Sequence, residues 1–299
     1  MKKRKSHIST IILVIVFFVG LSVMLYPTIS DLINAREQKE AIAAYDRTMS
    51  SMQESQKEKM LNDAIEYNNK LSKFFNPVET PDCVSGYENI LNVTGTGIIG
   101  YISIPKIKCE LPIYHGTSDA VLNVAVGHIK GSSMPIGGDS THSVISAHRG
   151  LPSAKLFSDL DQMEIGDIFE ITVLDQVIKY SVDKISVVYP DDLSKLKIEK
   201  GRDLVTLVTC TPYGVNTQRL LVRGKRIYAD DDTAIRVESD AFRIEPLIVA
   251  SVLSIPLLII IVIFFTSGTF RRRRRRKKLK RLVRKYRSNG DSGGDDIEK

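Results

Sequence analysis

Cys210 stands at the end of an apolar, β-branched segment, residues 205–209, and a turn with Pro212 and Gly214 follows it. A thiol in this position lies at the rim of a sheet or barrel, where a substrate can reach it. A lone cysteine is more often a small buried hydrophobic residue. Nucleophilic thiol catalysis therefore also requires a base and a cation nearby.

His148 and Arg219 are the candidates for those two partners. His148 follows the predicted strand 143–147, and Arg219 opens the strand after the turn that follows Cys210. If the two strands around that turn pair, Arg219 lies near the thiol; otherwise it is a surface ion-pairing residue. The other histidines considered lie before a strand or beside glycines, where we expect structural hydrogen bonding: His115, His128 and His142.

The chain has three cysteines, Cys83, Cys109 and Cys210. They are too few and too odd in number for the disulfide framework of an exported domain, so at least one thiol is unpaired.

Two apolar runs, residues 8–26 and 247–265, each hold 19 residues without a charged side chain. As helices they are about 28 Å long, the thickness of a bilayer's hydrocarbon core. We therefore expect two transmembrane helices. A cleaved signal peptide is the alternative for the first run, which is longer than a usual signal core and lacks a clear cleavage site. A buried core helix is the alternative for the second run, and six arginines from Arg271 argue against it.

Basic clusters flank both runs, in residues 1–7 and 266–299. Lys and Arg beside short spans stay in the cytoplasm, so both termini are expected there and the catalytic part outside. The first six residues carry +4 and residues 270–299 carry +10. Because the whole chain carries +7, the residues between them carry −7. The basic excess lies outside the globular part, so we expect a membrane partner and no nucleic acid.

Residues 27–75 show apolar side chains at helical spacing, and we expect an extracellular helical segment there that buries them. These side chains are Ile42, Tyr45, Met49, Met52, Leu61, Ile65 and Leu71. Residues 76–96 contain Pro and Gly and indicate a long loop. Residues 97–228 alternate short β-type runs with turns, which indicates a closed or nearly closed β-barrel. Short helices are expected at 118–126 and 154–160. Seven strands are expected, at 100–104, 109–113, 143–147, 168–173, 178–188, 205–210 and 220–227.

Residues 229–246 are polar and indicate a linker to the second run. Their Asp triplet, residues 230–232, could suggest Ca²⁺, but it lacks the Gly and Glu placement of an EF-hand loop, so a solvated linker is the favoured interpretation.

Over residues 98–228 the chain resembles the sortases, and among them the class C, pilus-assembling type. The resemblance rests on the TLxTC element at residues 206–210, the His-Arg-Gly at residues 148–150, the run LPIYHG at residues 111–116, and Arg219 in the run RLLVRG. A second membrane span is also a feature of class C members. The resemblance implies a mainly β fold, an eight-stranded sortase-type β-barrel with short helices, preceded by amphipathic helices and flanked by two transmembrane helices.

By resemblance, Cys210 is the nucleophile, His148 the general acid or base, and Arg219 the group that positions substrate and stabilises the oxyanion. Three residues of the TLxTC element are implied to bind substrate or support the site: Thr206, Leu207 and Thr209. The implied substrate is a pilin or surface protein with an LPxTG-like sorting signal, and the acceptor is a pilin lysine amine. A housekeeping sortase that attaches surface proteins to the cell wall is the alternative. No cofactor and no metal are expected.

Class C sortases usually carry a lid with a DP(F/W/Y)-like motif, which this chain lacks. The nearest candidate is residues 80–83, Thr-Pro-Asp-Cys. The hypothesis is that Asp82 pairs with Arg219 and that Cys83 lies near Cys210, which would make the lid sensitive to oxidation. An unrelated exposed loop is the alternative.

Two other function classes fit less well. In a papain-like hydrolase the cysteine precedes the histidine and begins a helix, whereas here the order is reversed and the cysteine ends a strand. A noncatalytic binding module with His142, His148 and Cys210 as zinc ligands lacks any familiar metal spacing.

Overall fold

The computed structural model describes residues 5–228. The expected linker at 229–246, the second apolar run at 247–265 and the basic tail at 266–299 lie outside the described residues, as do residues 1–4 of the basic N-terminus.

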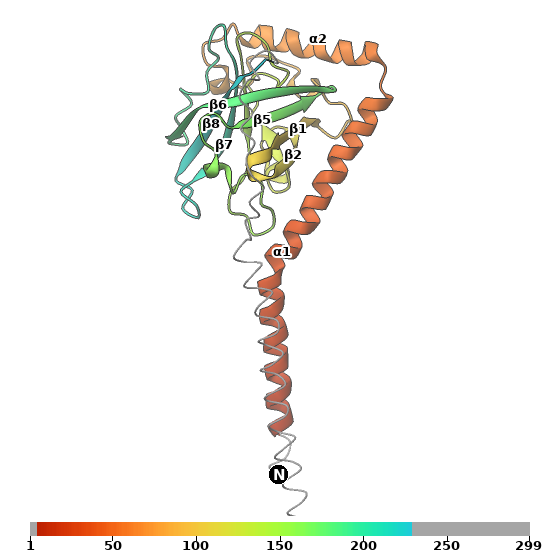
Figure 1. Ribbon diagram of the computed structural model, residues 1–299, viewed down its shortest axis with the longest axis vertical. Helices are drawn as coiled ribbons and strands as arrows, with labels where there is room; N and C mark the ends of the chain where they lie inside the picture. Colours follow the sequence, from red (N-terminus) through yellow and green to blue (C-terminus); the bar gives the residue numbers. More distant parts are fainter. Residues whose placement is uncertain (1–4, 229–299) are drawn as a thin grey trace, which may run out of the picture. The chain divides into compact units, whose positions relative to one another are not determined.

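Eight strands close into a barrel in the order β1-β2-β3-β4-β7-β8-β6-β5 (Figure 1). Their bounds are β1 Ile98–Ile104, β2 Cys109–His115, β3 Val126–His128, β4 Thr141–Ser146, β5 Ile168–Val173, β6 Gln176–Val188, β7 Asp203–Thr211 and β8 Gln218–Arg226. The β2–β3 and β4–β7 pairs are parallel, and the other neighbours are antiparallel. The predicted eight-stranded β-barrel is confirmed.

β7 is the strand that carries the TLxTC element, and it is paired on both edges, with β4 and with β8. Val205 and Leu207 face the barrel core, where both are fully buried. Val208 faces the other side and packs in a second apolar cluster with Leu196 and Leu221. A strand buried on both faces explains the nearly continuous run of apolar and β-branched residues that precedes Cys210.

The sequence missed β3, which has only three residues and contains a glycine, too short for an alternating pattern to show. The helix expected at 118–126 is only α3, Asp119–Leu122. The helix expected at 154–160 is wrong: Leu156 has φ +40° and the amide of Phe157 donates to the carbonyl of His148, so this segment forms turns that end in η4, Leu160–Gln162. A further 3₁₀ turn, η3, covers Pro105–Ile107.

Two helices precede the barrel, α1 over Lys5–Ser51 and α2 over Glu54–Leu71 (Figure 1). The part of α1 from Val14 is long and apolar enough to cross a membrane. Its apolar side chains, among them Val19 and Val23, are exposed in the described protein. A lipid environment would cover them, so α1 is a candidate membrane helix.

The end of α1 packs on the barrel through Ile42, Tyr45 and Met49, as the helical spacing predicted. The hydroxyl of Tyr45 donates to the carbonyl of Ile99 at 3.2 Å and accepts from the amide of Leu174 at 2.9 Å. Burial raises the pKa of this hydroxyl to about 12. Tyr45 therefore fixes the helix against β1 and the β5–β6 turn.

In α2 the buried face differs from the predicted one, because the expected core residue Ile65 is exposed. The buried side chains instead follow an i, i+3, i+4, i+7 pattern that includes a polar residue: Ala64, Tyr67, Asn68 and Leu71. Asn68 is tolerated there because it exchanges hydrogen bonds with the backbone of Met134. Its amide donates to the carbonyl at 3.2 Å and its oxygen accepts from the backbone N–H at 2.7 Å.

Residues 76–96 connect α2 to the barrel as a packed segment with two 3₁₀ turns, η1 Pro77–Glu79 and η2 Tyr87–Asn89. Val78, Tyr87 and Leu91 are buried. The segment is thus held against the barrel by its own side chains.

Candidate active site

Cys210 and Arg219 lie directly opposite each other on β7 and β8, which are joined by the turn at 212–217. Residues opposite each other in an antiparallel pair have Cβ atoms about 5 Å apart. Both residues are half-buried. The conditional expectation that these two strands pair is met, so the guanidinium comes from the residue next to the thiol.

His148 lies beside Cys210 on the other edge of β7. Ser146 of β4 is in register with Val208, the amide of Ala147 donates to the carbonyl of Val208 at 3.1 Å, and the hydroxyl of Thr209 donates to the carbonyl of Ala147 at 2.9 Å. His148 follows Ala147, and Cys210 follows Thr209. Adjacent strands are about 4.8 Å apart, so the backbone brings the imidazole and the thiol to one rim.

The loops around this rim are tied together by their own contacts. The guanidinium of Arg149 pairs with Asp161 and lies 5.5 Å from the ring centre of Tyr213. A Cβ at Gly150 would come within 3.2 Å of the same ring, and Gly150 has φ +75°. The glycine of the His-Arg-Gly element therefore allows Tyr213, in the β7–β8 turn, to close over the loop that carries His148.

Arg219 is held by backbone carbonyls on its own turn. Its Nη1 donates to the carbonyls of Asn216 at 3.2 Å and Gln218 at 3.1 Å. A guanidinium has five N–H groups, so donors remain for an oxyanion beside Cys210.

The three other residues of the TLxTC element make internal contacts. Leu207 lies in the barrel core, and Thr209 bonds the strand that ends in His148. Thr206 bonds the ring of His142 at 2.7 Å. These contacts support β7, and in this structure none of the three side chains faces the thiol rim as an open group.

His142 has the structural hydrogen-bonding role that its position before a strand predicted. Its Nδ1 lies 2.8 Å from the carbonyl of Lys197 and must donate, so Nε2 accepts from the hydroxyl of Thr206. Burial lowers the pKa of the ring to about 4. His142 thereby ties the connection between β6 and β7 to the strand that carries Cys210, and it is not available as a zinc ligand beside His148.

His115 and His128 also have structural roles, as expected. His115 contacts the carbonyls of Gly97 at 3.0 Å and Ile90 at 2.7 Å. His128 is fully buried, with Nε2 2.8 Å from the carbonyl of Ser133 and Nδ1 3.0 Å from the hydroxyl of Tyr87. Burial lowers the pKa of His128 to about 4.

The three thiols are all free, and they differ in environment. Burial raises the pKa of Cys109 to about 12, which removes it as a nucleophile. Cys83 packs against the main apolar cluster of the barrel and helices. Cys210 is the thiol at the strand end beside an imidazole and a guanidinium.

The expected pairing of Asp82 with Arg219 is wrong in this structure. Asp82 is exposed and its carboxylate lies 2.6 Å from the amino group of Lys130, in the connection between β3 and β4. That connection contacts the Cys83 loop near Gly131, where a Cβ would meet Pro77 and Pro81. The amide of Ile129, next to Lys130, donates to the carbonyl of Val144 in the middle of β4. The Asp82 ion pair therefore lies beside the middle of that strand and not at the end that leads to His148.

The comparisons with known proteins agree with this fold. A sortase domain model matches residues 102–227. Sortase C1 of Streptococcus agalactiae is 50% identical with a TM-score of 0.59, and the match covers 63% of this chain and 98% of that one. Sortase C of Streptococcus pneumoniae is 46% identical with a TM-score of 0.58, covering 63% and 97%. Sortase C of Clostridium perfringens SM101 is 37% identical with a TM-score of 0.55, covering 63% and 99%.

Among curated proteins, sortase D of Bacillus subtilis is 31% identical over 131 residues, which is 43% of this chain and 63% of that protein. Sortase A of Streptococcus agalactiae is also 31% identical, over 52% of its length. This chain thus spans between half and two thirds of these two relatives. With class C enzymes among its solved relatives over nearly their whole length, the chain belongs to the sortase family of cysteine transpeptidases.

Proposed function

We propose that this chain is a membrane-anchored class C sortase that cleaves an LPxTG-like sorting signal and joins the acyl fragment to a pilin lysine. The observation that carries the proposal is the strand register: Arg219 of β8 is opposite Cys210, and β4, which leads to His148, pairs with the other edge of β7. The pneumococcal sortase C has been described in terms of pilin substrate specificity, which supports a pilin substrate here.

In the proposed reaction the Cys210 thiolate attacks the threonyl carbonyl of the sorting signal. The thiolate is the reactive form of a cysteine. Arg219 stabilises the negative oxygen of the tetrahedral intermediate. His148 protonates the departing glycine amine, and a thioester on Cys210 remains.

The second half-reaction transfers the acyl group to an amine. The lysine ammonium first loses one proton to solvent, and the neutral amine then attacks the thioester. His148 accepts the second proton from the attacking nitrogen, and the Cys210 thiolate leaves as the isopeptide bond forms. A thioester favours aminolysis over hydrolysis more than an oxygen ester does. The result is a transfer of peptide instead of its hydrolysis.

Membrane anchoring suits this reaction, because secreted substrates await processing at the outer face of the membrane. α1 supplies one candidate membrane helix. Two spans, with both termini in the cytoplasm and the barrel outside, are part of the proposal, and its sequence basis is the basic residues that flank both apolar runs.

The proposal is tested with Cys210→Ala in cells, followed by immunoblotting for covalent high-molecular-weight surface polymers. We expect the polymer ladder to disappear, while Cys109→Ala, a matched control at a buried thiol, keeps it if the variant folds. An undiminished ladder in the Cys210 variant contradicts the proposal.

The same experiment separates the housekeeping alternative, which the similarity to a sortase A favours. If Cys210→Ala leaves polymers intact but releases single surface proteins from the cell wall, the chain is a wall-attaching sortase. With purified full-length protein, inhibition by EDTA and not by thiol alkylation would instead indicate a metal-dependent activity.

A further inference from the structure

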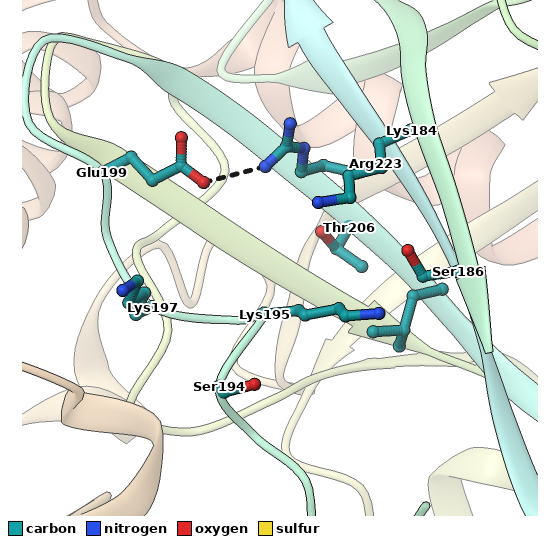
Figure 2. Close-up of a pocket in the computed structure, with 9 residues that line it drawn as sticks. Lys184, Ser186, Ser194, Lys195, Lys197, Glu199, Thr206 and Arg223 are labelled. Carbon is teal, nitrogen blue, oxygen red and sulfur yellow. Dashed lines mark hydrogen bonds and ion pairs between the residues drawn. The ribbon is translucent and has the colours of Figure 1, made fainter. Parts of the chain in front are cut away.

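A pocket of about 160 Å³ lies on the outer face of the barrel, between strands β6, β7 and β8 and the connection that joins β6 to β7 (Figure 2). Lys184 and Ser186 come from β6, Leu221 and Arg223 from β8, and Thr206 from β7. The connection adds the remaining lining residues, Ser194, Lys195, Lys197 and Glu199.

Four charged groups at one side of this pocket neutralise each other. Arg223 makes two hydrogen bonds to Asp183, at 2.8 and 2.9 Å, and a third to Glu199 at 2.8 Å. Arg202 bonds the same two carboxylates at 2.7 and 2.6 Å. Although burial opposes it, the guanidinium hydrogen bonds hold the pKa of Asp183 below its usual range. The Arg223 guanidinium is therefore fixed and already paired.

Three lysines add positive charge that this network does not balance. Within residues 5–228, no carboxylate lies within 4.0 Å of the amino groups of Lys184, Lys195 or Lys197. A β-bulge between Val182 and Lys184 places Lys184 opposite Arg223 on β8. Figure 2 shows the side chains of Lys184 and Lys195 extending into the pocket from β6 and from the connection.

The pocket shares a face of the barrel with the thiol. Side chains two apart on a strand lie on the same face, so Thr206 and Val208 share the face of Cys210. Thr206 lies four positions before Cys210 on β7, a span of about 13 Å. The buried apolar side chains of Val208 and Leu221, which are opposite each other, lie between the pocket and the thiol.

We propose that this pocket binds an acidic side chain of the peptide substrate, at the position directly before the LPxTG-like motif. The inference rests on the proposed function, since it needs a threonyl carbonyl at Cys210. An extended peptide covers about 13 Å in four residues. Its leucine and proline then span the distance between the thiol and the pocket, over the buried side chains of Val208 and Leu221. The residue before the leucine reaches the lysines, which attract a carboxylate as point charges.

The test compares two peptides that differ only in Glu or Gln directly before the motif, with full-length protein in detergent and steady-state kinetics. We expect the KM for the Glu peptide to be about fivefold lower, with kcat unchanged, because the contact is remote from the bond that breaks. The preference should shrink as salt rises. Lys184→Gln with Lys195→Gln should remove this preference, so that the KM values for the Glu and Gln peptides become equal.

Lys179→Gln is the matched control, on β6 but outside the pocket, and should keep the preference. A second variant, Lys184→Glu with Lys195→Glu, should favour a peptide with Lys before the motif. Equal turnover of both peptides by the unaltered protein, or a Glu preference that survives the double Gln variant, overturns the pocket assignment alone. Absence of any turnover that depends on Cys210 contradicts the proposed function instead.

Discussion

The two histidines at the ends of β4 show how one strand can carry a structural and a chemical imidazole six residues apart. His142 is fully buried, with both ring nitrogens bonded and a pKa lowered to about 4 by burial. His148 is partly exposed, and its ring makes no hydrogen bond to another described residue. The difference indicates that an imidazole is available for proton transfer at this barrel only where the strand emerges at the rim.

The largest expected effect comes from removing the imidazole of His148. His148→Ala should lower kcat for transpeptidation by roughly 100- to 10,000-fold, the usual contribution of a general acid or base. The unfolding free energy of the variant should change by less than about 0.5 kcal/mol, since the ring is not part of a buried network. Steady-state kinetics and calorimetry on full-length protein measure both quantities.

His142→Ala is the matched control, with the opposite pattern. It leaves the carbonyl of Lys197 and the hydroxyl of Thr206 buried without this partner, which should cost about 2 to 4 kcal/mol of unfolding free energy. If His142→Ala reduced kcat as strongly as His148→Ala while the protein stayed folded, the division between the two histidines would be wrong.

Arg219 and Arg223 extend the same comparison to β8. Arg219→Gln removes a cation that forms no ion pair with any residue of the described part, 5–228. We expect kcat to fall by about 100- to 1000-fold with little change in stability. Arg223→Gln removes three hydrogen bonds to Asp183 and Glu199 and should mainly destabilise the fold. Equal kinetic effects of the two variants would show that Arg219 has no special place beside Cys210.

The pH dependence of stability should report the buried histidines. His142 and His128 have pKa values of about 4 in the fold, against about 6.5 unfolded. Between these values the unfolded chain binds protons that the folded chain does not. Stability is therefore full above about pH 6.5 and falls toward pH 4, on the order of 3 kcal/mol for each ring.

Urea unfolding of full-length protein between pH 4 and 7 measures this slope. His142→Gln should flatten it, although the variant is less stable overall. A slope identical to that of the parent would mean that His142 is not held neutral by the fold.

The smallest effect is expected at the ion pair between Asp82 and Lys130. The Asp82 carboxylate is 84% exposed, and solvent screens exposed pairs so that they contribute little to stability. Asp82→Asn should therefore leave stability nearly unchanged and the alkylation rate of Cys210 within about twofold. A large acceleration of alkylation would restore the lid hypothesis for this loop.

The sequence predicted the barrel because its strands are short, alternating and bounded by turns, and it predicted the thiol, imidazole and guanidinium because each stands at a strand end. It did not predict β3, which is too short to show a period. It could not predict the partner of His142, because the hydrogen bond to Lys197 spans 55 residues of chain. Nor could it place Asp82, whose nearest cation is set by the packing of the loop on Gly131.

The central claim is that Cys210 carries the acyl intermediate, on β7 between β4, which leads to His148, and β8, which carries Arg219. The most direct measurement is mass spectrometry of full-length protein mixed briefly with an LPxTG-like peptide, with peptide mapping of the adduct before and after hydroxylamine. We predict an acyl mass on Cys210 that hydroxylamine removes and that Cys210→Ala abolishes. Turnover with the adduct on Cys83 or another residue, or turnover that persists in the Cys210 variant, would contradict the account.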